Sequence, residues 1–224
     1  MSNRIPQWYS LQQSYDGDGL RVKKNDNGTV TYYVRSSVLG GQVVAEINAA
    51  GMVARTYTYL GGQLLSLRNA AEKGGGTYWI HEDPITKSKR VTNSLGAVVS
   101  MVEMDPWGAD TTRSSNAAFQ PKKFTSYDLD GNGSDEAMFR RSNRWHSRFD
   151  QPDPYDGSYS LTNPQSFNRY AYVQSDPVNF IDPTGLRTCE PGEYSAECDS
   201  SGFGGWGGGW NFNDSRSSRS RHYK

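Results

Sequence analysis

The chain has 224 residues, and its 24 Lys and Arg balance its 24 Asp and Glu, so the formal net charge at pH 7 is zero. Phosphate binding needs a clustered excess of basic side chains, and this balance argues against nucleic acid as the main partner. No stretch has the roughly 18 successive apolar residues of a membrane span, and residues 1–9 lack the apolar run of a signal peptide. These features predict a soluble chain with no targeting segment of its own.

The aromatic content indicates the kind of interior to expect. Leu, Ile, Val and Phe are few, whereas 14 Tyr and 6 Trp supply broad apolar faces that each carry a polar tip. Such side chains suit strands that are half exposed to water. The composition predicts folded β-structure with a thin or hollow interior.

A turn-like pattern recurs along the first half of the chain. Asn-x-x-Gly occurs at Asn25–Gly28, Asn48–Gly51 and Asn93–Gly96, and the starts lie 23 and 45 residues apart. The second gap is nearly twice the first, so the period is about 22 residues, and the empty slot falls at Asn69–Gly74. This self-similarity predicts stacked structural repeats.

Segments rich in β-branched and aromatic residues flank these turns, and Gly supplies the positive φ that hairpin turns often need. The expected strands are Leu20–Lys24, Thr29–Val34, Gln42–Ile47, Val53–Tyr59, Gln63–Leu67, Ser88–Thr92 and Ala97–Glu103. With only some eight strands, we expect this sheet to stay unclosed. We therefore expect open edges that residues 109–186 or a partner must cover.

Four segments resemble rearrangement-hotspot (RHS) or YD-repeat proteins. Tyr15–Arg21 is similar to the Tyr-Asp signature of the repeat, and His81–Thr92 to a strand of the core. Arg148–Pro154 and Phe167–Leu186 resemble the motifs that close the core. The chain is thereby identified as similar to the C-terminal, repeat-associated core fragment of such a protein.

This resemblance implies an all-β fold in which antiparallel hairpins form part of a curved, YD-shell-like sheet. It implies three parts: a hairpin region over residues 1–108, a closing core segment with short helices or loops over 109–186, and a tail over 187–224. The tail is rich in Gly, Ser and Arg, a composition typical of disorder.

The resemblance also implies a function. Such shells enclose or display the polypeptide that follows them and serve as scaffolds of bacterial polymorphic toxins, often secreted or at the cell surface. The tail is too short and too polar for a folded toxin domain. The expected partner is the rest of a larger RHS polypeptide, or a protein that covers the open sheet edges.

The family implies a second function, single-turnover aspartyl self-cleavage. Asp153 and Asp182 match the motif acids, and the bond after Leu186 would be cut. Asn143 falls where the family has another Asp, and an amide cannot act as a general base, although Asp150 lies nearby. Both motif acids precede Pro and also fit ordinary turns, so a purely structural role stays open.

A third hypothesis is a surface module that binds carbohydrate or calcium. Exposed Tyr and Trp would stack on sugars. Asp128, Asp130 and Asn132 present oxygens at the alternate spacing of an EF-hand loop, but Phe139 stands where that loop needs a bidentate Glu. Apart from this calcium site, we expect no cofactor.

Overall fold

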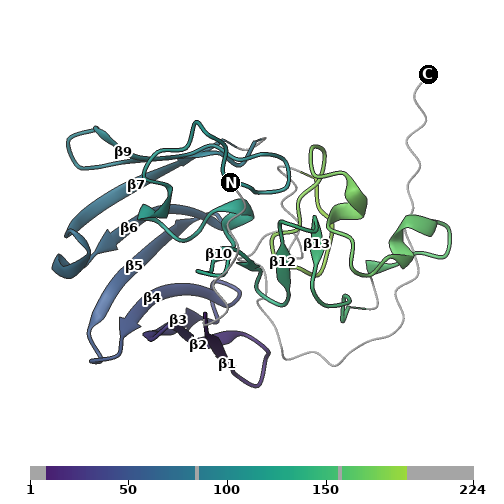
Figure 1. Ribbon diagram of the computed structural model, residues 1–224, viewed down its shortest axis with the longest axis horizontal. Helices are drawn as coiled ribbons and strands as arrows, with labels where there is room; N and C mark the ends of the chain where they lie inside the picture. The colour runs from purple at the N-terminus through teal and green to yellow at the C-terminus, as the bar shows by residue number, and fades with distance from the viewer. Residues whose placement is uncertain (1–8, 84–85, 156–157, 191–224) are drawn as a thin grey trace.

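The computed structural model describes residues 9–83, 86–155 and 158–190. Its main element is an open antiparallel sheet in which nine strands follow one another in chain order (Figure 1). The strands are β1 (Leu11–Tyr15), β2 (Arg21–Asp26), β3 (Thr29–Ser36), β4 (Gln42–Asn48), β5 (Val53–Leu60), β6 (Gln63–Asn69), β7 (Gly76–Glu82), β8 (Lys89–Thr92) and β9 (Val98–Val102). The predicted all-β fold of consecutive hairpins is therefore confirmed.

The Asn-x-x-Gly pattern marks three of the turns. Oδ1 of Asn93 accepts hydrogen bonds from the N–H groups of Leu95 and Ala97, each at 3.0 Å, and Gly96 has φ +78°. Asn48 closes the β4–β5 turn in the same way, through N–H donors on the second and fourth residues that follow it. The Asn carboxamide satisfies the turn amides, and Gly takes the left-handed conformation.

Two strands were not among the expected segments. The strand β1 precedes the first repeat, and β7 lies after the empty slot of the period. There the 3₁₀ helix η1 (Ala71–Lys73) and Gly74, with φ +90°, replace the Asn-x-x-Gly turn. Because this turn lacks the Asn-x-x-Gly pattern, the sequence repeat did not predict β7.

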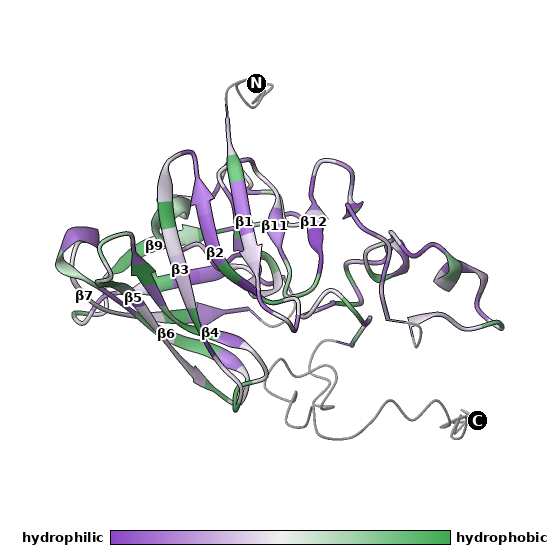
Figure 2. Cartoon of the chain, turned by 90° about the horizontal axis from the view of Figure 1, so that it is seen from below, coloured by the Kyte–Doolittle hydropathy of each residue, from purple (hydrophilic) through white to green (hydrophobic). Residues whose placement is uncertain are grey.

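The closing segment forms a second sheet of four short strands. They are β10 (Asp128–Leu129), β11 (Asp135–Glu136), β12 (Arg141–Asn143) and β13 (Arg148–Phe149). Short 3₁₀ helices accompany them: η2 (Ala117–Phe119), η3 (Phe124–Ser126), η5 (Pro164–Phe167) and η6 (Val173–Ser175). Figure 2 shows β11 and β12 beside β1, and Oε1 of Glu136 accepts a hydrogen bond from Tyr15 at 3.0 Å.

Two apolar clusters support the two sheets. One, centred on the fully buried Leu67 and Val91, lines the inner face of the large sheet, where Phe119 of η2 packs against it. The other surrounds Phe149 and Tyr172 in the closing segment and includes Val102 at the end of β9. The last strand of the large sheet thus belongs to the core of the closing segment.

The two edges of the large sheet differ. The outer edge of β9 is covered, because Met101 and Ser115 exchange backbone hydrogen bonds of 2.9 and 2.8 Å. Among the described residues β1 pairs only with β2. Within the described ranges, the closing segment therefore covers the β9 edge of the sheet and leaves the outer edge of β1 unpaired.

The first four residues of the predicted tail, 187–190, belong to the described chain. Residues 187–190 remain packed: the backbones of Ile181 and Cys189 pair through bonds of 2.9 and 2.7 Å, and Cys189 is buried. These backbone bonds hold the chain beyond Leu186. The rest of the predicted tail, 191–224, lies outside the described residues. None of the described helices has the length and apolar character needed to cross a bilayer.

Two glycines allow steric and conformational effects to be separated. Gly96 and Gly108 have similar φ values, +78° and +87°, but a Cβ on Gly96 would meet open space, whereas one on Gly108 would lie 2.6 Å from Cγ of Phe124. We expect Gly96→Ala to cost about 1 kcal/mol and Gly108→Ala about 1–3 kcal/mol more, as measured by urea unfolding. Equal losses for both variants would contradict the close packing at Gly108.

Candidate functional site

Asp153 and Asp182 lie close together, because both carboxylates contact one guanidinium group. Nη2 of Arg140 is 3.0 Å from Oδ2 of Asp153 and 3.3 Å from Oδ2 of Asp182. All three residues are buried, with exposed fractions of 4%, 7% and 2% for Arg140, Asp153 and Asp182. The two acids selected by the family resemblance therefore form one buried cluster.

One hairpin positions Arg140 and Asp153. Arg140 directly precedes β12 and Asp153 follows β13, so the pairing of these two strands brings the residues to the same end. The Arg140 guanidinium lies 3.7 Å from the ring centroid of Phe149, and the backbone N–H of Asp153 donates to the carbonyl of Arg169 at 2.9 Å. These contacts hold the Arg140 side chain and the Asp153 backbone in place at this end of the hairpin.

Asp182 organises the turn that contains the predicted cleavage point. Its Oδ1 accepts hydrogen bonds from four consecutive backbone N–H groups: Thr184 at 3.3 Å, Gly185 at 2.7 Å, Leu186 at 3.1 Å and Arg187 at 3.3 Å. The last of these is the nitrogen of the bond between Leu186 and Arg187. The Asp182 carboxyl group therefore contacts the nitrogen of the peptide bond that self-cleavage would break.

The same turn is held from two further directions. Nε of Arg140 donates a hydrogen bond to the carbonyl of Gly185, and the Tyr127 hydroxyl donates to the carbonyl of Asp182. Nη1 of Arg140 also donates to the carbonyl of Arg169 at 3.0 Å. Arg140 thus bonds to both acids and to the turn that they flank.

Burial perturbs both acids. It raises the pKa of Asp182 to about 6, against the opposing effect of Arg140 and of the backbone N–H donors. It also raises the pKa of Asp153, again opposed by Arg140. A protonated carboxyl group at Asp182 is therefore populated in mildly acidic solution, as general acid catalysis requires.

A small polar cavity adjoins the acid pair. Its volume is about 30 Å³, and Asp153, Asp182, Leu186 and Arg187 contribute to its wall. This volume is enough for one water molecule, and the surrounding polar groups offer the two to four partners that a buried water needs. The site therefore has room for a single water molecule.

Asn143, which replaces a family Asp, lies elsewhere. It belongs to the β12–β13 turn, where its Oδ1 accepts from the N–H of Trp145 at 3.1 Å and its Nδ2 donates to Asp150 at 3.1 Å. In the described part of the chain, neither Asn143 nor Asp150 is hydrogen-bonded to Asp153 or Asp182. The amide supplies the acceptor oxygen that the turn uses and also the donor that bonds to Asp150.

The predicted calcium residues lie in and beside the β10–β11 hairpin, and basic side chains already occupy their oxygens. Asp130 accepts from Arg21 at 2.9 Å, from Lys24 at 3.0 Å and from Arg141 at 3.2 Å. Oδ1 of Asn132 accepts from the N–H and hydroxyl of Ser134 at 3.0 and 2.7 Å. A calcium ion would have to displace these donors.

Asp128 is held by cations as well. Lys122 and Arg21 lie 3.3 Å from its two carboxylate oxygens. Burial would raise the pKa of Asp128, but Lys122 and Arg21 overcome that effect and hold it well below its usual range. In the described part of the chain no three His, Cys, Asp or Glu side chains are grouped to hold a metal. Calcium binding stays a prediction.

Arg140 and Arg21 were not among the residues selected from the sequence. Each is the common counter-ion of several buried carboxylates. Nothing in the local sequence distinguishes these two arginines from the others.

No protein-family model matches the chain. It is 31% identical over 176 residues to the tRNA3(Ser)-specific nuclease WapA of Bacillus spizizenii and, over the same length, to the tRNA nuclease WapA of Bacillus subtilis. Each match covers 76% of this chain and 7% of the relative. The chain therefore spans only a small part of the length of these curated proteins.

Solved structures have a similar fold. The Photorhabdus luminescens Tc holotoxin pore matches 83% of this chain with a TM-score of 0.58 and 16% identity, and a TcdB2–TccC3 complex matches 82% with a TM-score of 0.56 and 16% identity. The matches cover 9% and 10% of those chains. TccC3 is an RHS-repeat protein and WapA an RHS-type nuclease, and the likeness to both shows that this chain has an RHS-like β-shell fold.

Proposed function

We propose that the chain is a structural segment of an RHS-type shell, in which it encloses or displays the polypeptide that follows Leu186. The main support is the unequal treatment of the two sheet edges. The closing segment covers β9, while β1 pairs only with β2 among the described residues. A sheet whose β9 edge is covered and whose β1 edge is unpaired can be extended by a further strand that pairs with β1.

The register of β1 identifies the groups that would pair. The N–H of Asn27 donates to the carbonyl of Ser10 at 2.8 Å, so Ser10 and Asn27 form a hydrogen-bonded antiparallel pair. Since such pairs alternate along a ladder, the N–H groups of Leu11 and Gln13 point away from β2. These groups are the donors that an added strand would meet.

The purified chain should therefore associate reversibly through β1, and Leu11→Pro should prevent this association. Proline removes an outward donor at the first residue of an edge strand, where it is tolerated. Sedimentation velocity over a range of concentrations measures the effect. Leu95→Asp, which changes an exposed residue of the β8–β9 turn, should leave association unchanged. A monomer at every concentration would contradict an edge available for pairing.

We propose self-cleavage after Leu186 as a second function, since the acid pair adjoins that bond. Ionised Asp153 would take a proton from the water in the small cavity, and the water oxygen would attack the carbonyl carbon of Leu186. As the C–N bond of the resulting tetrahedral intermediate breaks, protonated Asp182 would give its proton to the nitrogen of Arg187, which in the uncleaved chain lies 3.3 Å from Oδ1 and donates its N–H to it. The peptide bond breaks, leaving a carboxylic acid on Leu186 and an amine on Arg187.

Intact-mass spectrometry of purified protein tests this second function. The expected products are two fragments that together exceed the 25.0 kDa chain by one water molecule, with the new N-terminus at Arg187. A full-length chain that stays intact during prolonged incubation at mildly acidic pH would rule out cleavage and leave the structural role standing.

A further inference from the structure

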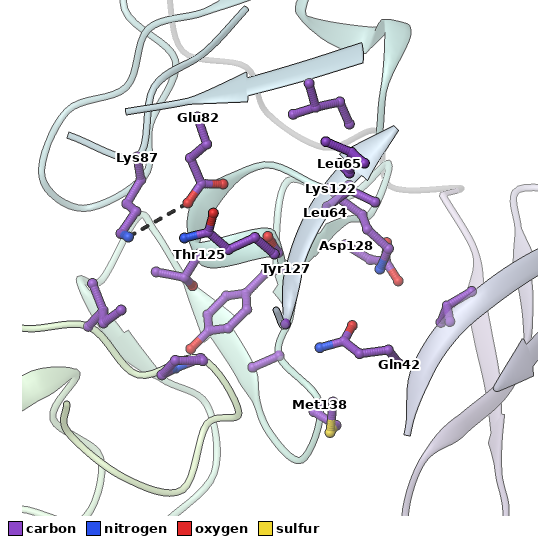
Figure 3. A pocket seen from close by; sticks show the side chains of 18 of the residues that line it. Gln42, Leu64, Leu65, Glu82, Lys87, Lys122, Thr125, Tyr127, Asp128 and Met138 are labelled. Carbon is purple, nitrogen blue, oxygen red and sulfur yellow. Dashed lines mark hydrogen bonds and ion pairs between the residues drawn. The ribbon is translucent and has the colours of Figure 1, made fainter. Parts of the chain in front are cut away.

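A cavity of about 280 Å³ lies between the large sheet and the closing segment. Its volume is just below the roughly 300–1,000 Å³ of most small-molecule sites. Residues of strands β3 to β7 line one side, and residues of the closing segment between Lys122 and Met138 line the other, as Figure 3 shows from close by. The cavity is separate from the acid pair, because Asp153 and Asp182 do not line it.

The half-buried Arg35 lines this cavity and has no carboxylate partner among the described residues. Its Nε donates to the carbonyl of Arg21 at 2.8 Å, and its Nη1 donates to the carbonyl of Gly41 at 2.7 Å. These bonds use two of the five N–H donors of a guanidinium group and supply no negative charge. Burial lowers the pKa of Arg35, and the acids in its surroundings do not offset this effect. A cation drawn out of water in this way is stabilised by an anion that pairs with it.

The acidic residues of the wall do not supply that anion, because each of them already has a cation. The ion pairs, at 3.0–4.0 Å, join Glu82 to Lys87 and Lys89, Asp128 to Lys122 and Arg21, and Glu136 to Arg21. Lys87 and Lys122, the other two basic residues that line the cavity, therefore both have a carboxylate partner. An anion that enters the cavity meets the Arg35 guanidinium as the cation left to pair.

The rest of the wall combines one free carboxamide with an apolar surface. Gln42 is 9% exposed, its side chain points into the space in Figure 3, and no described residue is hydrogen-bonded to its carboxamide. Val43, Leu64 and Ile80 are buried and line the cavity together with Met138. Such a surface packs against hydrocarbon and leaves the oxygens of phosphate or sulfate without hydrogen bonds. The anion that fits therefore carries an apolar body.

We propose that this cavity binds a small organic monocarboxylate with a branched-alkyl or aryl body. The remaining N–H groups of Arg35 and the carboxamide N–H of Gln42 donate hydrogen bonds to the carboxylate, which the planar guanidinium edge matches in shape. The apolar side chains pack against the body of the acid. The exposed Leu60 and Gln63 of the β5–β6 turn also line the cavity, so the ligand enters from solvent there. This site depends on neither the shell function nor self-cleavage.

Titration calorimetry of the purified chain at neutral pH with isocaproate and hydrocinnamate, and with the amides of both acids, tests the proposal. At least one acid should bind and raise the melting temperature. Its amide should bind about tenfold or more weakly, because the charged contact with Arg35 is lost. Gln42→Glu should weaken binding of the acid by a similar factor, because it places a second negative charge beside the ligand.

Gln12→Glu is the matched control, because it makes the same change on the exposed side of β1 and should leave the Kd unchanged. Arg35→Met should abolish binding, and if that variant does not fold, Gln42→Glu decides. Failure of both acids to bind would overturn the proposal. Equal affinity for an acid and its amide would overturn it as well, since the guanidinium would then not recognise the ligand. Binding that is unchanged in Gln42→Glu would place the acid on another surface, with the same consequence.

Discussion

Replacing Arg21 with Met should lower the free energy of unfolding by about 3–5 kcal/mol at pH 7, the usual loss when one partner of a buried ion pair is removed. Arg21 is 0% exposed and lies within 2.9 Å of Asp130, 3.3 Å of Asp128 and 4.0 Å of Glu136. Arg21 belongs to the large sheet, whereas the three carboxylates belong to the β10–β11 hairpin, with Asp130 in its turn. The variant leaves those acids buried and undercompensated at the junction of the two sheets.

The loss should depend on pH in a defined direction. The pKa of Asp128 is lowered in the folded chain, so its ionised form stabilises the fold above the unfolded pKa of about 4, and this stabilisation disappears as pH falls toward the folded value. The deficit of Arg21→Met should therefore be complete at pH 7 and shrink below about pH 4. Urea unfolding at several pH values measures it.

Lys23→Met is the control for this prediction. Lys23 lies on the same strand, but its ammonium is 5.4 Å from the ring centroid of the half-exposed Tyr32. Its loss should cost less than about 1 kcal/mol. Similar losses for the two variants, or a deficit that grows as pH falls, would show that Arg21 does not hold the two sheets together.

Self-cleavage should accelerate as pH falls through about 6, and Asp182→Asn should slow it about 10²–10⁴-fold. Burial raises the pKa of Asp182 to about 6, so the protonated form that donates to Arg187 becomes abundant only below that pH. Asparagine keeps an Oδ1 that accepts the four backbone N–H bonds of the turn, which separates the loss of the proton from a loss of structure. The fraction of cleaved chain over time, measured by mass spectrometry, gives the rate.

Asp150→Asn serves as the comparison, because Asp150 is exposed and bonded to Asn143 in the β12–β13 turn. It should cleave at the wild-type rate. Asp153→Asn should slow cleavage like Asp182→Asn, since the water would lose its base. A rate that does not change between pH 5 and 8, or that survives Asp182→Asn, would exclude the proposed use of this acid pair.

The hairpins could be predicted because their determinants are local. Asn48 and Asn93 satisfy the amides of their own turns, and Gly51 and Gly96 take positive φ without strain. All seven expected strands are present, with ends shifted by at most two residues. The strand β7 escaped prediction because its turn uses a 3₁₀ helix, which leaves no repeating pair of residue types in the sequence.

Simple alternation of side chains along β2 does not predict which face of the sheet each side chain occupies. Strict alternation would place Arg21 and Lys23 on one face. The register shifts between Ser14 and Tyr15, so that Tyr15 opposes Arg21 while Ser14 opposes Lys23. This bulge turns Arg21 toward the small sheet while Lys23 lies over Tyr32. A bulge follows from the pairing of two strands, and neither strand encodes it alone.

The all-β repeat, the closing motifs and the choice of Asp153 and Asp182 all follow from the amino-acid sequence. The ion-pair partner of each acid depends on the tertiary structure. Arg140 pairs with both Asp153 and Asp182, and the predicted calcium ligands Asp128 and Asp130 pair with Arg21, Lys122 and Arg141. Turn geometry depends on neighbouring residues, whereas the partner of a buried charge depends on which distant segments exclude water together. A carboxylate removed from water must find a counter-ion, but only the packed sheets specify which one.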